Sequence, residues 1–256
     1  MNLSPNIVPV VPAGTDVMNF RLPDDITVKA LEFGRECSPL LVIDQCIDRP
    51  EVLVELASEC EFSPPKQAFP GVRAVAPEAY QAYLALTLFP HLAVALQPLL
   101  QTHFSLTGDR VRFSMCHYSL VTTPATQLGM IQRIPHVDSF DSQGLATVHY
   151  LFRKPLGGTA FYRHRKTGFE VINESRKREY FRSLEAENAG PDLPESGYIN
   201  GDTPLFEQIT RQEAVYNRML IYRRSSLHSG CIDPAFVPDA NPATGRLSIN
   251  SFIDIL

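Results

Sequence analysis

The stretch VRFSMCHYSLV, residues 111–121, marks the point where the sequence changes from a helical to a strand-like pattern. Before it, residues 78–101 carry apolar side chains at helical spacing, which predicts a helix packed on a sheet and broken or kinked at Pro90. After it, turn-forming stretches such as residues 155–158 separate further segments that predict strands. These segments are residues 145–152, 159–164, 218–222 and 246–253.

The amino-terminal part of the chain adds strands and a helix to this pattern. Residues 26–34 and 39–45 predict strands, and Asp48 is placed to cap a helix that begins near Pro50 and runs to Cys60. A polar helical stretch, residues 173–190, interrupts the later strands. We therefore predict an α+β protein whose centre is a double-stranded β-helix, a jelly-roll or cupin-like barrel, flanked by the N-terminal helices.

Length and composition favour one globular domain. The chain has 256 residues, 44% of them apolar, which is enough for a substantial core. Residues 1–24 contain four prolines and predict an N-terminal arm, and residues 25–256 predict a single jelly-roll domain. Neither a signal-like leader nor an apolar stretch of about 20 residues is present, so we expect a soluble, cytoplasmic protein without membrane contact.

The charge and the cysteines exclude several classes of function. The net charge of −5 arises from 23 basic and 28 acidic residues without a long run of one sign, so we expect no nucleic-acid partner. The five cysteines are scattered and never form a C-x-x-C pair, which argues against a disulfide framework and a structural zinc site. A small-molecule substrate is the favoured partner.

The stretch QRIPHVDSF, residues 132–140, holds a candidate half of a metal site. On an extended segment His136 and Asp138 point to the same face, where an imidazole and a carboxylate could bind one ion. Because roughly one such match is expected by chance among seven histidines, the motif needs a third ligand. His228 is the candidate, since a jelly roll brings distant strands together. The other histidines predict structural or surface roles: His91, His103, His117, His149 and His164.

The last predicted strand supplies an independent observation. Two histidines and one carboxylate on one face form the facial triad of non-haem Fe(II) oxygenases. Alternation along residues 246–253 places Arg246, Ser248 and Asn250 on one face and apolar side chains on the other. If the apolar face meets an outer layer, Arg246 points into the barrel, where a buried guanidinium requires an anion such as a carboxylate. The alternative is a surface strand with Arg246 in water.

These motifs together resemble a known superfamily. HVD at 136–138, HSG at 228–230 and the R-x-S of Arg246 and Ser248 occur in that order within a β-rich carboxyl half. This arrangement resembles the Fe(II)- and 2-oxoglutarate-dependent dioxygenases, and within them a bacterial branch without an assigned activity. The resemblance covers roughly residues 40–256, including GGTAFY at 157–162.

The resemblance implies a role for each of these residues. It makes His136, Asp138 and His228 the Fe(II) ligands and Arg246 the partner of the distal carboxylate of 2-oxoglutarate. Ser248 is the residue that would share this carboxylate with Arg246. Tyr118 matches a tyrosine that members of the superfamily often aim at the cosubstrate, although it fits a core position equally well. The separation of His228 and Arg246 by 18 positions (246 − 228 = 18) is larger than usual in the family and predicts an inserted loop over residues 231–245.

The resemblance also implies a reaction. With O₂ as co-reactant, a small-molecule or amino-acid-like substrate would be hydroxylated, or otherwise oxidised, with release of succinate and CO₂. The aspartate at position 138 favours hydroxylation over halogenation, because relatives that halogenate have a small residue at the carboxylate position.

Other interpretations stay open from the sequence alone. A cupin-like metal-dependent non-redox enzyme or small-ligand binding protein would keep the barrel and the metal but require neither 2-oxoglutarate nor Arg246. In a purely structural interaction module, the HVD motif would be accidental. The charged segment 163–188 is either a solvated helix or a lid in which Arg163, Arg165 and Lys166 recognise an anionic substrate.

Overall fold

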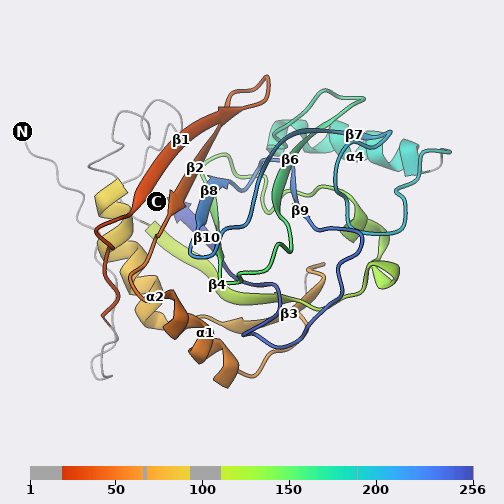
Figure 1. The fold of residues 1–256 in the computed structure, drawn as a ribbon. Coiled ribbons are helices and arrows are strands. Elements are labelled where there is room, and N and C mark those ends of the chain that lie inside the picture. Colours follow the sequence, from red (N-terminus) through yellow and green to blue (C-terminus); the bar gives the residue numbers. More distant parts are fainter. Residues whose placement is uncertain (1–18, 66–67, 93–110, 189, 256) are drawn as a thin grey trace, which may run out of the picture.

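Two antiparallel β-sheets form the centre of the described protein (Figure 1), a computed structural model that describes residues 19–65, 68–92, 111–188 and 190–255. The larger sheet has the strand order β1-β2-β8-β5-β10-β4-β3, and the smaller has the order β7-β6-β9. The strands are β1 (Thr27–Phe33), β2 (Ser38–Asp44), β3 (Gly71–Val75), β4 (Val111–Val121), β5 (Leu145–Tyr150), β6 (Gly158–His164), β7 (Phe206–Gln212), β8 (Met219–Arg223), β9 (His228–Cys231) and β10 (Leu247–Ile255).

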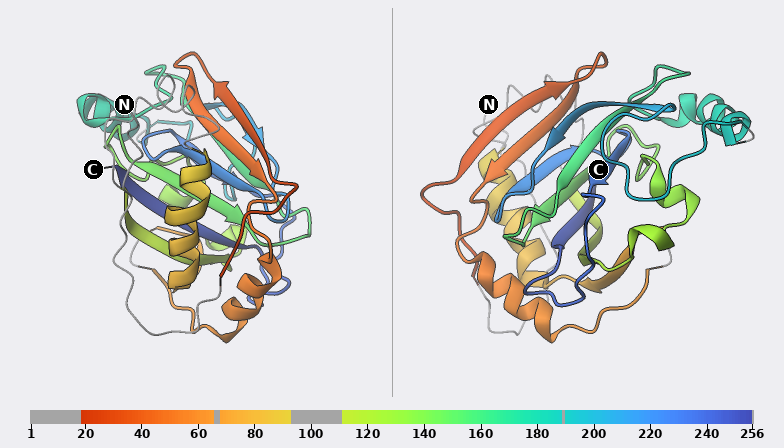
Figure 2. Two further views of the ribbon diagram at one scale, coloured as in Figure 1. Left: turned by 90° about the vertical axis from the view of Figure 1, so that its left-hand side faces the viewer. Right: turned by 45° about the vertical axis from the view of Figure 1, so that its right-hand side comes forward.

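Helices cover the outer faces of the sheets (Figure 2). The first, α1 (Pro50–Glu59), and the second, α2 (Glu78–Tyr83), pack against the larger sheet, whereas α4 (Glu174–Asn188) lies beside the smaller one. The architecture is therefore mixed α+β with N-terminal helices on one face, which confirms the α+β part of the sequence prediction.

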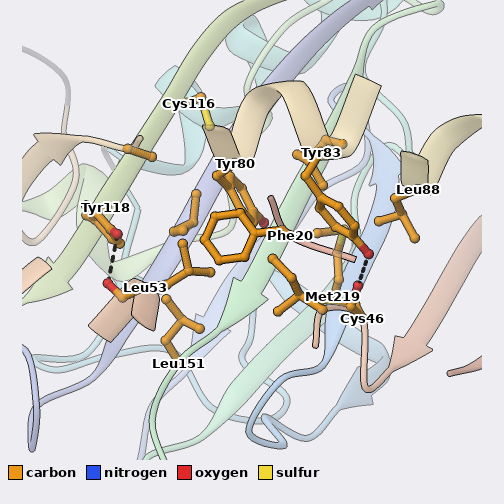
Figure 3. Close-up of a cluster of buried hydrophobic side chains, with 14 of the residues drawn as sticks. Phe20, Cys46, Leu53, Tyr80, Tyr83, Leu88, Cys116, Tyr118, Leu151 and Met219 are labelled. Carbon is orange, nitrogen blue, oxygen red and sulfur yellow. Dashed lines mark hydrogen bonds between the residues drawn. The ribbon is translucent and has the colours of Figure 1, made fainter. Parts of the chain in front are cut away.

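The largest apolar cluster fills the layer between the larger sheet and its helices (Figure 3). Leu53 of α1 and Tyr80 of α2 are fully buried there and meet Leu247 and Ile249 of β10. These strand residues belong to the apolar face that alternation predicts, so the opposite face of β10 is turned toward the space between the sheets.

A second cluster joins the two sheets. Val148 of β5 and Tyr222 of β8 meet Phe161 of β6, and all three are buried. A third cluster, with Tyr162 of β6 and Tyr180 of α4, closes the outer face of the smaller sheet. Since both faces of each sheet are covered, the central strands lack the polar and apolar alternation of a half-exposed strand.

Two sequence predictions about helix ends need correction. Of the break or kink predicted at Pro90, the break is wrong: a π-helical turn (Leu84–Leu88) follows α2, and the helix continues through Pro90 to Leu92. A π-turn just before a proline accommodates its missing N–H. The rest of that predicted helix, to residue 101, lies outside the described residues. Helix α1 has the predicted bounds, but Asp48 does not cap it.

Asp48 instead holds the segment that precedes β1. Its Oδ1 accepts the backbone N–H of Arg21 at 3.0 Å, and its own N–H donates to the Arg21 carbonyl at 3.1 Å. Next to this pair, Phe20 is buried in the largest cluster. Residues 1–18 of the predicted arm lie outside the described residues, and residues 19–24 pack on the domain. None of the described helices combines the length and apolarity needed to cross a bilayer.

Candidate metal centre and its cavity

The structure brings His136, Asp138 and His228 together. One nitrogen or oxygen atom from each lies within 4.8 Å of the others. Asp138 Oδ1 is 3.6 Å from His136 Nε2, and Asp138 Oδ2 is 3.4 Å from His228 Nε2. Two imidazoles and a carboxylate in this arrangement are a donor set that suits a divalent iron and leaves other coordination positions open.

Hydrogen bonding and charge prepare these side chains for a metal. His228 Nδ1 donates to the Ser226 carbonyl at 2.9 Å, which leaves the lone pair of Nε2 facing Asp138. Burial lowers the pKa of His228 to about 4. Burial raises the pKa of Asp138, but His228, His136 and Arg73 outweigh it and hold that pKa below its usual value. At neutral pH the centre thus offers a neutral imidazole and a carboxylate, the states that metal binding requires.

The loop between β8 and β9 contacts two of the three candidate ligands, the backbone of Asp138 and the ring of His228. The carbonyl of Arg224 accepts the backbone N–H of Asp138 at 2.8 Å, and two residues later the Ser226 carbonyl holds the ring of His228. The buried side chain of Arg224 forms an ion pair of 2.5 Å with Asp254 on β10. The loop therefore ties both ligands to the larger sheet.

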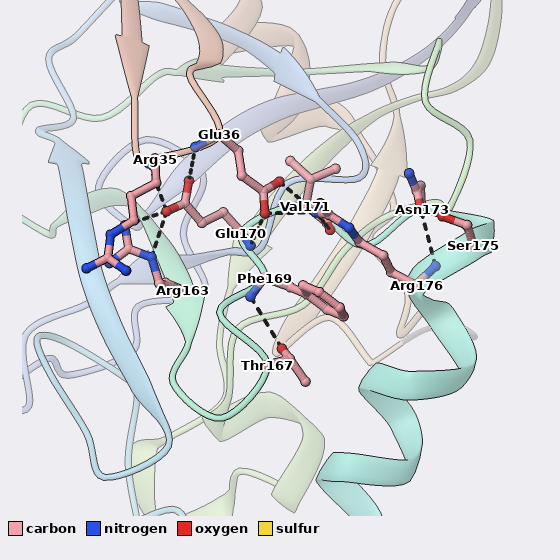
Figure 4. Close-up of polar contacts among 10 residues, drawn as sticks. All are labelled: Arg35, Glu36, Arg163, Thr167, Phe169, Glu170, Val171, Asn173, Ser175 and Arg176. Carbon is pink, nitrogen blue, oxygen red and sulfur yellow. Dashed lines mark hydrogen bonds and ion pairs between the residues drawn. The ribbon is translucent and has the colours of Figure 1, made fainter.

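A buried glutamate supports the same loop from the other side (Figure 4). The Glu170 carboxylate accepts the Arg163 Nε–H at 2.7 Å and the backbone N–H groups of Arg35 and Glu36 at 3.0 Å. The Glu170 carbonyl accepts the N–H of Leu227, the residue before His228, at 2.8 Å. Arg163 thus belongs to the support of the centre.

Of the two alternatives for the charged segment, a solvated helix or a lid that recognises the substrate, the structure does not support the lid. Arg163 is paired with Glu170 and with Glu207, and Arg165 lies 3.1 Å from Asp202. No residue of 163–188 lines the cavity at the metal centre. The segment forms a helix and a buried ion-pair network beside the smaller sheet.

A cavity of about 350 Å³ contains the candidate metal centre and lies between the two sheets. Arg246 lines it and is buried, with Nε donating to the Leu156 carbonyl at 3.0 Å and Nη2 donating to the carbonyls of Gly157 and Gly158 at 3.3 and 2.9 Å. Burial lowers the pKa of Arg246, and no carboxylate among the described residues pairs with it. A buried guanidinium that donates hydrogen bonds to neutral carbonyls and lies over an aromatic ring, here Phe152, is suited to an anionic ligand.

The remaining predictions for the last strand agree with the structure. Ser248 and Asn250 line the cavity with Arg246, and Ser248 Oγ donates to Asn250 Oδ1 at 2.7 Å. The residues between β9 and β10 form neither helix nor strand, so the inserted loop that the spacing predicts is present.

The cosubstrate role considered for Tyr118 is wrong. Its hydroxyl donates to the Leu53 carbonyl at 2.7 Å inside the largest apolar cluster (Figure 3). On β4 the side chains of Cys116, Tyr118 and Leu120 point to the helices, whereas Val121 lines the cavity. Tyr118 is therefore a core residue on the opposite face of the strand.

Other residues that the sequence analysis did not select line the same cavity. Tyr222 packs its ring 4.8 Å from that of His228, and the Tyr198 hydroxyl donates to the Thr123 carbonyl at 2.6 Å. Arg73 enters from β3, a strand of five residues that carried no clear sequence signal.

Comparison with solved structures gives distant similarities. The chain is similar to HygX from Streptomyces hygroscopicus, in a crystal structure with nickel and 2-oxoglutarate bound, at 14% identity and a TM-score of 0.45, over 86% of this chain and 84% of that one. It is also similar to SnoN, the non-haem alpha ketoglutarate dependent epimerase from nogalamycin biosynthesis, at 12% identity and a TM-score of 0.40, over 84% and 76% of the two chains.

Sequence comparison covers almost the whole domain. No curated protein matches the chain significantly. A family model, described as a family of unknown function, matches residues 24–253, which include the three candidate ligands and Arg246. The chain therefore belongs to the DUF6445 family.

Proposed function

We propose that the protein is a non-haem Fe(II)- and 2-oxoglutarate-dependent oxygenase that hydroxylates, or otherwise oxidises, a small-molecule substrate. The observation that carries this proposal is the meeting of His136, Asp138 and His228, with ligand atoms within 4.8 Å of one another, in the cavity that Arg246 also lines. Two imidazoles and one carboxylate hold Fe(II) in oxygenases of this kind and leave positions for a chelating cosubstrate and O₂.

Arg246 is the proposed partner of the distal carboxylate of 2-oxoglutarate. Its guanidinium is buried, its hydrogen bonds to the described residues all go to carbonyls, and it lies over the ring of Phe152, so a carboxylate would supply the missing negative charge. Ser248 lies two residues along the same face and would contact that carboxylate through its hydroxyl. When bound, iron and 2-oxoglutarate would supply the oxidising chemistry, with succinate and CO₂ as products.

The strand order supports a double-stranded β-helix as the finer description of the fold. The strands β4, β10, β5 and β8 are consecutive in the larger sheet and face β6, β7 and β9 across the second apolar cluster. An isolated bridge between His136 and His228 extends the smaller sheet by one further segment. Two facing four-stranded layers with these long connections are typical of a jelly roll.

The test is the visible absorption of the anaerobic complex. Wild-type protein with Fe(II) and 2-oxoglutarate is expected to develop the weak charge-transfer band of the chelate, and His136→Ala is expected to lose it. His91→Ala, which changes an exposed histidine outside the cavity, is the matched control and should keep the band. Metal binding without a band in the wild-type protein would contradict the assignment of 2-oxoglutarate as cosubstrate. In that case an assay of succinate release could not be used to search for the substrate.

A further inference from the structure

The tyrosine that packs against a candidate metal ligand has an unused hydroxyl. Tyr222 of β8 is buried and lines the cavity, and its ring centroid is 4.8 Å from that of His228. Burial, and then the carboxylate of Asp138, raise the pKa of Tyr222, so the phenol lies near that carboxylate and keeps its proton at neutral pH. The hydroxyl makes no hydrogen bond with a described residue and is not one of the fully enclosed polar atoms, so it opens onto the cavity.

Two comparable hydroxyls around the cavity already have partners. Tyr198, which also lines the cavity, donates to the Thr123 carbonyl at 2.6 Å. The hydroxyl of Tyr150 shares a hydrogen bond of 2.7 Å with that of Thr159. A buried tyrosine usually finds a partner for its hydroxyl, so a free one beside the candidate metal ligands points to a ligand as its partner.

Tyr222 and Arg246 lie far apart along the cavity face of the larger sheet. Tyr222 pairs with Ala146 across the sheet, and Ala146 pairs with Phe252 of β10. Tyr222 is therefore level with a residue six positions beyond Arg246 on β10 (252 − 246 = 6), and six positions of a strand span about 20 Å. The two side chains cannot both contact the same end of a small ligand.

The smaller sheet gives the distance from Arg246 to the candidate metal centre. Arg246 Nη2 donates to the Gly158 carbonyl at 2.9 Å, and His228 pairs with Phe161, three positions further along β6 (161 − 158 = 3). Three positions of a strand span about 10 Å. A five-carbon diacid that is chelated at one end and ion-paired at the other bridges a distance of this size. The hydroxyl of Tyr222 therefore lies beside the chelated end and not beside the distal carboxylate.

We propose that the Tyr222 hydroxyl donates a hydrogen bond to the chelating end of the cosubstrate, to an oxygen of its 2-oxo acid group. This inference rests on the proposed function, which places 2-oxoglutarate between the metal and Arg246. The two ends of the cosubstrate are then held by different groups, the distal carboxylate by a guanidinium and the chelating end by a neutral donor. The same hydroxyl serves any small acid that chelates the metal through two oxygens.

Two chelating acids separate the two ends of the site. Oxalate chelates a metal through two oxygens but has no distal group, so its affinity measures the metal end alone. Oxalate and 2-oxoglutarate are each titrated by calorimetry into protein loaded with Ni(II). Tyr222→Phe keeps the ring against His228 and removes only the hydroxyl, and it should weaken the binding of both acids about tenfold or more, the loss expected for a hydrogen bond to a charged group. Arg246→Gln should weaken the binding of 2-oxoglutarate only.

Tyr198→Phe is the matched control, because it removes a hydroxyl that serves the Thr123 carbonyl in the same cavity. Its affinities for both acids should stay within about twofold of the wild-type values. A second readout is the charge-transfer band of the anaerobic complex with Fe(II) and 2-oxoglutarate. The band should move to shorter wavelength in Tyr222→Phe, because a 2-oxo group that loses a hydrogen bond has an acceptor orbital of higher energy.

Three results would each overturn the inference: unchanged affinities for both acids in Tyr222→Phe, a weakening of 2-oxoglutarate without oxalate, or an equal loss in Tyr198→Phe. A fall in Ni(II) affinity as large as that for the acids would also overturn it, by showing that the hydroxyl supports the metal ligands instead. Failure of the proposed function gives a different result. Metal-dependent oxalate binding that requires Tyr222, without any binding of 2-oxoglutarate, would contradict the proposed function and support the role of Tyr222 toward a chelating acid.

Discussion

His136 and His228 exchange both backbone hydrogen bonds, each 2.9 Å long, although 92 positions separate them in the sequence (228 − 136 = 92). This pairing is the single antiparallel bridge between the HVD segment and β9. It sets the distance between the two rings, whose centroids are 4.5 Å apart, through the backbone. Replacement of either side chain therefore removes a ligand while the backbone contact stays in place.

The first prediction concerns the affinity for a divalent metal when either histidine is replaced. His228→Ala and His136→Ala are each expected to weaken Fe(II) or Ni(II) binding by at least about 100-fold, more than the loss typical of removing an outer partner of a ligand. Calorimetric titration under anaerobic conditions measures this, with circular dichroism as the check on folding. Wild-type affinity in both variants would contradict the metal centre.

The second prediction concerns Arg246 and the cosubstrate. Arg246→Gln is expected to raise the dissociation constant of 2-oxoglutarate about 10- to 100-fold, because a charge-assisted hydrogen bond is lost. Arg246→Lys should recover only part of the affinity, since an ammonium cannot reproduce the planar fork. Metal affinity without 2-oxoglutarate should not change. A simultaneous loss of metal affinity would instead indicate damage to the fold.

Much of this site could be predicted from local patterns. Alternation along residues 246–253 identified the cavity face of β10, because Leu247 and Ile249 lie on one face and Arg246, Ser248 and Asn250 on the other. The HVD motif and His228 could be joined only through the predicted jelly-roll topology and the family resemblance, since no local signal encodes a bridge across 92 positions.

The failures have a common physical cause. Strand β4 is covered by the helical layer on one face and lies against the cavity on the other, so its sequence does not reveal which face holds Tyr118. Strand β3 is a five-residue edge strand after Pro70, too short to show a period, and Arg73 was missed with it. The break predicted as one alternative at Pro90 is absent because a π-helical turn precedes the proline.

The third prediction concerns the loop between β8 and β9, whose carbonyls bind two of the candidate ligands. Arg224→Met removes the ion pair with Asp254 and should loosen the backbone that holds Asp138 and His228. We expect metal affinity to fall about tenfold, as for outer partners of metal ligands, and the absorption band of the Fe(II) complex to shift. Arg112→Gln is the matched control, because Arg112 pairs with the same Asp254 from an exposed position. An equal effect of both variants would show that the ion pairs act only on stability.

A buried histidine network explains a further property, the response of stability to pH. His149 is fully buried, with Nε2 3.2 Å from both Cys46 Sγ and Asn217 Oδ1 and Nδ1 3.1 Å from the Tyr80 hydroxyl. Burial lowers its pKa from 6.5 to about 4, although the hydrogen bond with Asn217 acts in the opposite direction. The network joins the helical layer to β5 and does not line the cavity.

The fourth prediction is that His149 destabilises the fold in mild acid. Above pH 6.5 His149 is neutral in both the folded and the unfolded state, and its contribution to stability is complete. Between pH 6.5 and about 4 the unfolded chain takes up a proton at this histidine and the folded chain does not, so the free energy of unfolding falls. At pH 5 this amounts to about 2 kcal/mol. Urea denaturation in the presence of a chelator, at pH 7 and pH 5, should show that loss in wild type and a loss smaller by about 2 kcal/mol in His149→Gln. Because His228 is present in both proteins, the difference between them isolates His149. Equal losses in the two proteins would mean that the pKa of His149 is the same in the folded and unfolded states. The loss of stability in acid would then arise from other groups.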